Sequence, residues 1–303
     1  MKERIGFIGL GAMGLPMVKN VLKNGYQVTA YDIVKAKLEE AVAAGAERAD
    51  SCKMVAAQSE IIITILPAAA HVKAAVLGVG GVIEGIKAAS TVIEMSTIDP
   101  MTINEVASKL AEKGVDMLGA PVVRGVNGAI NGTLSIYVGG DAAVFDRCKA
   151  LLSTMGTDIE YCGDTGTGNV AKLINNMIVG ITTCVLSEAL VLGVKAGVNP
   201  DVLFNSLSKG SANSFVLQNH MKNYALRGDF REGMFSIDYE MKDLGLALST
   251  AEHLHVPQYF ASLASQTYEQ ARAIGLSKQY YPAVIKVAEG LAGVEVRLDA
   301  TQK

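Results

Sequence analysis

Residues 5–25 read IGFIGLGAMGLPMVKNVLKNG, and this stretch decides the fold of the first half of the chain. An apolar run typical of a buried strand leads into Gly9, Gly11 and Gly14, and a helical pattern follows over residues 13–24. In such a turn the first glycine permits the bend, the second lets the backbone approach a pyrophosphate, and the third allows close packing of helix on strand. The stretch predicts a dinucleotide site at a helix N-terminus.

A glycine-rich turn alone is also compatible with an ordinary tight turn, so its surroundings matter. Asp32 ends the next expected strand, where an acidic side chain accepts hydrogen bonds from ribose hydroxyls and repels a 2′-phosphate. We therefore expect NAD(H) as the preferred cofactor. NADP(H) is the less favoured alternative, and Lys35 and Lys37, which follow closely, soften the preference for NAD(H).

Strand-like and helical segments alternate through the first half of the chain. We expect strands at residues 4–9, 27–32, 60–66, 90–95 and 115–120, and helices at 13–24, 34–44, 69–76 and 100–113. This βαβ rhythm predicts a parallel sheet with helices on both faces. Two more strands, within residues 132–140 and 157–162, flank a helix near 142–155.

After Cys162 the strand signals stop. One unusually long helical pattern crosses residues 163–198, and helices alone follow near 200–209, 215–227, 239–254, 258–274 and 282–293. The sequence predicts an α/β protein with a Rossmann-type doubly wound sheet in residues 1–163. A long inter-domain helix joins it to an all-α domain in residues 164–303.

Charge and composition favour small-molecule chemistry. The net charge is −3, so we expect no nucleic-acid and no membrane partner. Residues 176–198 are apolar and long enough to cross a bilayer, but Glu188 lies near their middle, so we expect a buried helix between domains. The four cysteines form no Cys-x-x-Cys pair, and no signal peptide is recognisable; both features favour reduced thiols and a cytoplasmic location.

The candidates for proton transfer do not include a histidine. His71, His220, His253 and His255 adjoin no glycine turn or carboxylate cluster, and no metal-ligand spacing is present, so we expect structural or exposed histidines and no metal. In GTGNVAKLINN, residues 166–176, the helical spacing places Lys172, Asn175 and Asn176 on one face. Ordinary solvent exposure of a first helical turn is the alternative. A desolvated lysine is able to act as general acid or base.

A third segment, FSIDYEMKDLGLAL over residues 235–248, contains Phe235, Lys242 and Asp243. A core aromatic residue with helix-surface charges is the plain interpretation of these three. Combined with the segments above, however, they carry a family resemblance.

The ordered set of segments resembles the β-hydroxyacid dehydrogenase family, which includes 3-hydroxyisobutyrate dehydrogenase, tartronate semialdehyde reductase and 2-(hydroxymethyl)glutarate dehydrogenase. A more distant likeness is to 6-phosphogluconate dehydrogenase. The resemblance rests on IGFIGLGAMGLPMVKNVLKNG, ITILP, EMST, GTLSIYVGG, GTGNVAKLINN and KDLGLAL, and it covers nearly the whole chain. It implies hydride transfer between a nicotinamide cofactor and a small anionic β-hydroxy acid or semialdehyde, in a cleft between the two domains of a homodimer or homotetramer. It also implies substrate binding and oligomerisation by the all-α domain.

The resemblance also implies residue roles. Lys172 matches the catalytic lysine and Asn176 the substrate asparagine, with Asn175 its neighbour; Lys242 matches a residue that reaches the cofactor. Phe235 and Asp243 match further residues of the cleft. The matching cofactor residues are Gly9, Gly11, Ala12, Met13, Gly14, Asp32, Leu66, Pro67 and Thr97.

One loop departs from the family pattern. Members usually read Asp-Ala-Pro-Val-Ser-Gly-Gly, with serine and glycine amides on the substrate carboxylate, whereas residues 119–125 read GAPVVRG. Val123 replaces the serine, and Arg124 precedes Gly125. An arginine here resembles sulfolactaldehyde reductases, which use it on a sulfonate, although Gly125 and Val126 replace the two hydroxyl residues of that branch. A planar fork of donors suits a doubly charged or tetrahedral anion. An arginine that faces solvent or pairs with a carboxylate is the alternative.

Three other functions compete with an NAD-dependent β-hydroxy acid dehydrogenase. The first is reduction of 3-sulfolactaldehyde to 2,3-dihydroxypropane-1-sulfonate. The second is imine reduction, which shares the glycine-rich opening but generally lacks the lysine followed by paired asparagines. The third is a non-catalytic NAD-binding scaffold, in which the lysine is typically lost.

Overall fold

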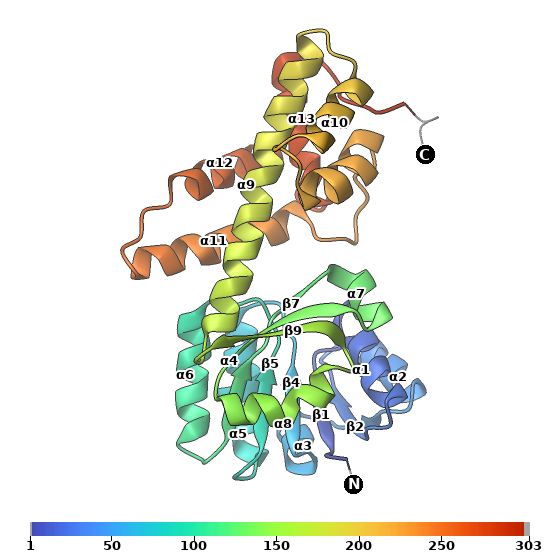
Figure 1. The fold of residues 1–303 in the computed structure, drawn as a ribbon. Coiled ribbons are helices and arrows are strands. Elements are labelled where there is room, and N and C mark those ends of the chain that lie inside the picture. The colour runs from blue at the N-terminus through green and yellow to red at the C-terminus, as the bar shows by residue number, and fades with distance from the viewer. Residues whose placement is uncertain (1, 300–303) are drawn as a thin grey trace. The chain divides into compact units, whose positions relative to one another are not determined.

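The computed structural model describes residues 2–299 (Figure 1). By internal contacts the chain divides into two compact units, Met1–Lys172 and Leu173–Lys303. This division falls inside the long helix α9 (Thr167–Lys195). The domain boundary between residues 163 and 164 stays a prediction.

The first unit contains one nine-stranded sheet in the order β3-β2-β1-β4-β5-β6-β8-β7, with β9 also paired to β8. Strands β1 to β6 pair in parallel, which is the strand order of a Rossmann sheet and confirms the predicted fold class. The strands are β1 Ile5–Ile8, β2 Val28–Tyr31, β3 Glu47–Arg48, β4 Ile61–Thr64, β5 Thr91–Glu94, β6 Asp116–Gly119, β7 Val122–Val123, β8 Leu134–Gly139 and β9 Gly156–Gly163.

The expected parallel sheet is confirmed for the strands up to β6, and the strands after β6 do not all follow that direction. Strand β8 runs antiparallel to β6 and β7 and parallel to β9. The connection between β7 and β8, residues 124–133, contains α7 and returns the chain beside β7 in the opposite direction.

Both faces of the sheet are covered, and its central strands β1, β4 and β5 are buried at every position. On β4, Ile61 and Ile63 pack into one core together with α1 and α8, while Ile62 packs into a second core with α3, α4 and α6. Successive side chains of a strand point to opposite faces, so an uninterrupted apolar run fits a sheet buried on both sides. The helices of this unit are α1 Gly14–Lys23, α2 Lys35–Ala43, α3 Cys52–Gln58, α4 Ala69–Leu77, α5 Val82–Gly85, α6 Pro100–Ala111, α7 Gly125–Asn131 and α8 Ala142–Leu152.

Several short elements were not expected from the sequence: β3, α3, α5, β7 and α7. Helix α7 begins at the end of the loop over residues 119–125. Its boundaries are left-handed residues, Arg124 at φ +84° and Gly132 at φ +67°, and its glycines and asparagines have low helix propensity. Packing therefore forms this helix against the preference of its residues: Asn20 of α1 donates a hydrogen bond to the carbonyl of Ala129 at 2.7 Å.

The described part of the second unit is helical apart from one isolated bridge, between Ser236 and Tyr280. One expected helix, residues 215–227, is broken into a π-helical turn, Val216–Met221, and a 3-10 turn, Ala225–Arg227. Another, residues 282–293, begins with the 3-10 turn Tyr281–Val284. The α-helices after α9 are α10 Pro200–Lys209, α11 Ile237–His253, α12 Tyr259–Ala273 and α13 Ile285–Ala292.

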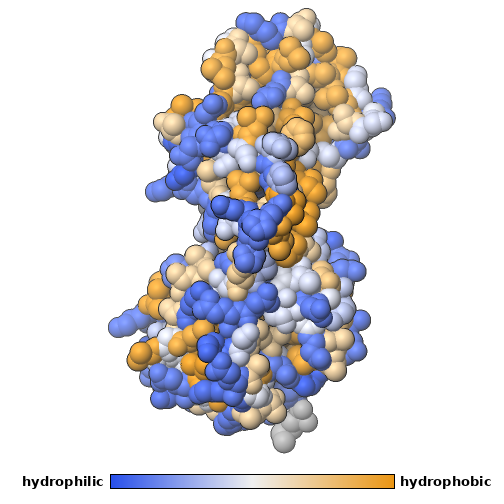
Figure 2. All heavy atoms as spheres, turned by 90° about the vertical axis from the view of Figure 1, so that its left-hand side faces the viewer, coloured by the Kyte–Doolittle hydropathy of each residue, from blue (hydrophilic) through white to orange (hydrophobic). Residues whose placement is uncertain are grey.

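Helix α9 is long and apolar enough to cross a membrane by length and composition, and 39% of its most apolar window is buried. Core helices of soluble proteins pass the same test. The expectation of a buried helix is wrong for one side, where Val185 is 57% and Leu192 70% exposed. Figure 2 shows apolar side chains gathered on the surface of the helical unit.

Candidate functional site

The glycine turn between β1 and α1 has the shape that a dinucleotide phosphate requires. Gly9 has φ +96°, and a Cβ there would lie 2.2 Å from the carbonyl oxygen of Ile65. A Cβ on Gly14 would lie 1.9 Å from the carbonyl oxygen of Gly9, whereas a Cβ on Gly11 would meet nothing within 4 Å. Two glycines are thus required by the turn itself, and the third leaves open space beside the helix N-terminus. The turn therefore fits a pyrophosphate.

Asp32 is held at the carboxyl end of β2 by two backbone amides. Its carboxylate accepts from the amide of Leu10 at 2.6 Å and from the amide of Val34 at 2.7 Å. Each oxygen retains a lone pair, so the group remains able to accept from a ribose. Of the two nearby lysines, Lys37 pairs with Glu40 at 2.6 Å.

Ala12 and Met13 lie in the glycine turn, with Ala12 exposed and Met13 half-buried. Leu66 and Pro67 follow β4, and Thr97 follows β5, so these three also lie at the carboxyl edge of the parallel strands. In open α/β sheets, ligands bind outside this edge. The structure thus brings the predicted cofactor residues of the first unit to one edge of its sheet.

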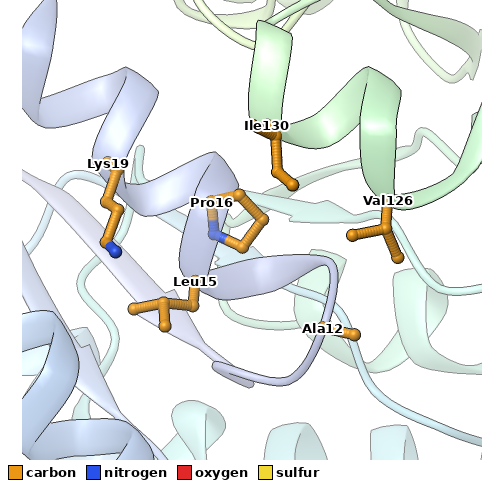
Figure 3. A pocket seen from close by; sticks show the side chains of 6 residues that line it. All are labelled: Ala12, Leu15, Pro16, Lys19, Val126 and Ile130. Atoms are coloured by element: carbon orange, nitrogen blue, oxygen red, sulfur yellow. The ribbon is translucent and has the colours of Figure 1, made fainter. Parts of the chain in front are cut away.

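A cavity of about 380 Å³ lies beside this turn, between α1 and α7 (Figure 3). Its walls are almost entirely apolar. The lining residues are Ala12, Leu15, Pro16, Lys19, Val126 and Ile130.

Sequence reasoning missed a buried carboxylate at the same edge. Glu94, the last residue of β5, is 0% exposed, accepts from the amide of Ser96 at 2.6 Å and accepts a hydrogen bond from the Thr64 hydroxyl. The signal was available in STVIEM, where one acid interrupts an otherwise apolar strand.

Asn169, on the first turn of α9, was also missed. Its amide nitrogen donates to the carbonyls of Ser96 and Ile98 at 3.4 and 3.3 Å, and its own oxygen has no hydrogen-bond partner. A Cβ on Gly119 would lie 2.7 Å from that oxygen. Gly119 replaces the acid of the family pattern, and the close approach of Asn169 depends on this glycine.

Arg124 adopts the carboxylate-paired alternative. Its guanidinium forms an ion pair with Asp158 at 2.5 Å and donates to the Thr133 carbonyl at 3.0 Å and the Thr157 hydroxyl at 3.2 Å. The side chains of Arg124 and Asp158 are 47% and 58% exposed, and exposed pairs are weak. Val123 lies in β7 opposite Ser135 of β8, and Gly125 begins α7 at φ +59°.

Helix α9 carries Lys172, Asn175 and Asn176 in succession. Lys172 is 8% and Asn176 6% exposed, so the alternative of a solvated first turn is wrong for both. Asn175 is half-buried and donates its side-chain amide to the Asn176 oxygen at 2.9 Å.

Within the second unit, Asn176 meets Asp243 of α11. The Asn176 amide donates to one Asp243 oxygen at 2.5 Å, and the Lys242 amine lies 3.1 Å from the other. Asp243 is 1% exposed, so it is not a helix-surface charge. Phe235 is half-buried and stacks on Tyr239, with the ring centroids 5.9 Å apart.

The histidines belong neither to the predicted cofactor residues nor to the polar cluster of α9 and α11. His71, His253 and His255 are exposed, while His220 lies in the π-helical turn with its ring nitrogen 2.5 Å from the Tyr280 hydroxyl. Burial lowers the pKa of His220 to about 4, so it is neutral near pH 7. Among residues 2–299, no group of three or more His, Cys, Asp or Glu side chains is placed to hold a metal ion. The four cysteines are free.

Two family models match the chain. Residues 4–163 match the NAD-binding domain of 6-phosphogluconate dehydrogenase, and residues 166–288 match the NAD-binding domain of NADP-dependent 3-hydroxyisobutyrate dehydrogenase. Over 293 residues the chain is 43% identical to 2-(hydroxymethyl)glutarate dehydrogenase of Eubacterium barkeri, and the match covers 97% of each protein. The chain belongs to the β-hydroxyacid dehydrogenase family.

Other members of the family are similar over most of their length. The chain is 38% identical over 269 residues to 3-hydroxyisobutyrate dehydrogenase of Pseudomonas aeruginosa, a match covering 87% of this chain and 90% of that protein. A solved structure of the Mycobacterium tuberculosis 3-hydroxyisobutyrate dehydrogenase with L-serine superposes with a TM-score of 0.89 at 30% identity, covering 94% of this chain and 99% of that one.

Membership of the β-hydroxyacid dehydrogenase family confirms the enzyme class, a dehydrogenase that acts on a CH–OH group with a nicotinamide cofactor. The choice between NAD and NADP, the substrate and the role of each residue stay predictions.

Proposed function

We propose that the protein is an NAD-dependent dehydrogenase that interconverts a small anionic β-hydroxy acid and its semialdehyde. The observation that carries the proposal is the buried pair of Asn176 of α9 and Asp243 of α11, with the buried Lys172 one turn before Asn176 on α9. Burying polar side chains on otherwise apolar helices lowers the stability of the fold. Such clusters are therefore typical of binding or catalytic sites.

The preference for NAD rests on Asp32. Its carboxylate is fixed by the amides of Leu10 and Val34, and a second negative charge at the ribose would face it directly. Lys37 is already paired with Glu40, which weakens the case for NADP. Fluorescence titration with NADH and NADPH tests the preference, and tighter binding of NADPH would reject it.

In the proposed mechanism, bound nicotinamide supplies the hydride acceptor in oxidation and the hydride donor in reduction. The amine of Lys172 accepts the hydroxyl proton of the substrate in oxidation and returns it to the carbonyl oxygen in reduction. Asn176 positions the same substrate oxygen, and Asp243 positions Asn176 through their 2.5 Å hydrogen bond.

Replacement of the lysine tests this assignment. Lys172→Ala should lower kcat about 10²- to 10⁴-fold while the far-ultraviolet circular dichroism and the melting temperature stay close to wild type. Lys209→Ala, at the end of α10, is a matched control. Retained turnover in Lys172→Ala would remove Lys172 from the mechanism.

A second candidate substrate class is either a dicarboxylate or a sulfonate, with 3-sulfolactaldehyde as the example of the latter. Arg124 favours it, because the guanidinium is half-exposed and its present partner is an exposed carboxylate, an ion pair that a bound anion can replace at small cost. The similar protein from Eubacterium barkeri is named for a dicarboxylic substrate, 2-(hydroxymethyl)glutarate.

A substrate panel separates these classes. Methylmalonate semialdehyde, tartronate semialdehyde, succinic semialdehyde and 3-sulfolactaldehyde are tested with NADH, and 3-hydroxyisobutyrate and 2-(hydroxymethyl)glutarate with NAD. If Arg124 binds a second carboxylate or a sulfonate, Arg124→Ser should reduce kcat/KM on 2-(hydroxymethyl)glutarate or on 3-sulfolactaldehyde about 10²-fold and leave the monocarboxylates unaffected. An unchanged profile would leave Arg124 as a partner of Asp158 only.

Imine reduction and a silent scaffold are disfavoured by the same residues. Both classes generally lack a lysine followed by paired asparagines, which this chain has at Lys172, Asn175 and Asn176. A cyclic imine added to the panel tests the first alternative, and any turnover of a hydroxy acid excludes the second.

We also propose a cytoplasmic homodimer or homotetramer without nucleic-acid or membrane partners. Its support is the exposed apolar surface of the helical unit, where Tyr259, Phe260 and Leu263 of α12 are 80%, 73% and 66% exposed. Light scattering on the purified protein measures the mass, and a monomer that stays soluble without detergent would reject the oligomer.

A further inference from the structure

Glu94 ends β5 in the middle of the parallel sheet, between two uncharged neighbours. In the strand register it lies opposite Thr64 of β4 on one side and Gly119 of β6 on the other. The residue is 0% exposed. A carboxylate withdrawn this far from water is costly unless donors surround it.

Donors do surround it. The amide of Ser96 donates at 2.6 Å, and the hydroxyl of Thr64 donates as well. The Ser96 oxygen in turn accepts from the amide of Leu66 at 2.7 Å. Because both contacts are donors, they favour the ionised carboxylate, which accepts hydrogen bonds more strongly than the protonated acid does.

These bonds join two turns that are far apart in the sequence. The first follows β4 and contains Leu66 and Pro67; the second follows β5 and contains Ser96 and Thr97. Asn169 of α9 adds two longer hydrogen bonds to the second turn, through the carbonyls of Ser96 and Ile98. Glu94 therefore links the end of β4, through Thr64, to the turn after β5, through Ser96.

We propose that Glu94 is a positioning residue, whose ionised carboxylate holds the turns after β4 and β5 in the arrangement that binds the nicotinamide cofactor. It acts through Ser96 and Leu66 rather than by touching the reacting atoms. This inference rests on the proposed cofactor site, because Leu66, Pro67 and Thr97 are the predicted lining residues.

The carboxylate titrates in an accessible range. Burial raises the pKa of Glu94 to about 7, and the hydrogen bonds from Ser96 and Thr64 limit the rise. The groups that face it from neighbouring elements, Thr64, Gly119 and Ser96, carry no charge, and Lys172 is the ionisable residue on the first turns of α9. Mild acid should therefore release the two turns and weaken cofactor binding.

The test measures NADH affinity directly, by fluorescence titration of the whole protein at about pH 6 and about pH 8.5, on either side of this pKa. Wild type is compared with Glu94→Gln. At the higher pH the variant should bind NADH about tenfold more weakly, the worth of one charge-assisted hydrogen bond. At the lower pH the two affinities should converge, because wild type is then neutral at this position too. Glu112→Gln, at the exposed end of α6, is the matched control.

The result is the ratio of the NADH dissociation constants of Glu94→Gln and wild type at each pH. Groups that titrate equally in both proteins have no effect on this ratio. A ratio of one at both pH values, or the same ratio at both, overturns the inference. If Glu94→Gln does not fold, Thr64→Val removes one donor at nearly constant volume and should move the midpoint of the wild-type pH step upward; an unmoved midpoint also overturns it. Wild type that binds no NADH at either pH would instead reject the proposed function.

Discussion

The hydrogen bond between Asn176 and Asp243 allows a quantitative prediction. The Asp243 carboxylate is 1% exposed, accepts from the Asn176 amide at 2.5 Å and lies 3.1 Å from the Lys242 amine. Asn176 itself is 6% exposed, so water cannot readily replace either partner. The perturbation is the pair of truncations Asn176→Ala and Asp243→Ala, made singly and together.

Each truncation removes the same hydrogen bond to a charged group, which contributes about 1.5 to 3 kcal/mol. Lys242 is 30% exposed, so its ion pair adds less to the cost of losing Asp243, about 0.5 kcal/mol. The double variant loses the shared bond only once. Its loss of stability should therefore fall short of the sum of the single losses by about 1.5 to 3 kcal/mol.

The assay is urea unfolding of the four proteins, followed by circular dichroism at constant pH and salt. Activity is not needed, so the result does not depend on the substrate. If the coupling is below about 0.5 kcal/mol, the bond contributes little and the reasoning about a buried polar pair is refuted.

Three further predictions concern the sheet unit. Gly14→Ala should abolish NADH binding and lower the melting temperature, whereas Gly11→Ala should weaken binding with little change in stability, because its Cβ meets nothing within 4 Å. Gly119→Ala should cost about 1 to 3 kcal/mol of unfolding free energy by pushing on the Asn169 oxygen, and Asn169→Ala should restore part of it; additive losses would contradict the contact. The pKa of Glu94 is about 7 in the folded protein and 4.5 ordinarily, so between these pH values the folded protein binds one proton more than the unfolded chain. The free energy of unfolding should therefore fall as the pH rises from 4.5 to about 7. Glu94→Gln should lack that decline, which pH-dependent denaturation curves measure directly.

The parallel core of the fold was predictable because its signal is local. Uninterrupted runs such as Ile61 to Thr64 suit only a strand buried on both faces, and the glycine turn fixes where the first helix starts. Helix α7 was not predictable from its residues, because Gly125, Gly128 and Asn131 disfavour a helix and packing against α1 outweighs that preference. The reversal of β8 depends on pairing that no local pattern reveals.

In the candidate site, too, the residues with a local sequence signal were predictable and their remote partners were not. Lys172, Asn175 and Asn176 share one helix, so their spacing was informative, whereas the partners of Asn176 and Arg124 are remote in sequence, at Asp243 and Asp158. The position of Glu94 against Thr64 likewise comes from strand register. Side-chain partners across elements require the tertiary structure.

The left-handed backbone of Arg124, φ +84°, has a consequence for how this position is inherited. A non-glycine residue in that conformation costs roughly 1 kcal/mol, which glycine avoids. A library selected only for folded protein should therefore drift toward glycine or asparagine at residue 124. Selection for growth on the physiological substrate should retain arginine there if the guanidinium is needed for activity. Deep sequencing of the library after each selection would therefore distinguish a functional role of Arg124 from a structural one, without knowledge of the ligand.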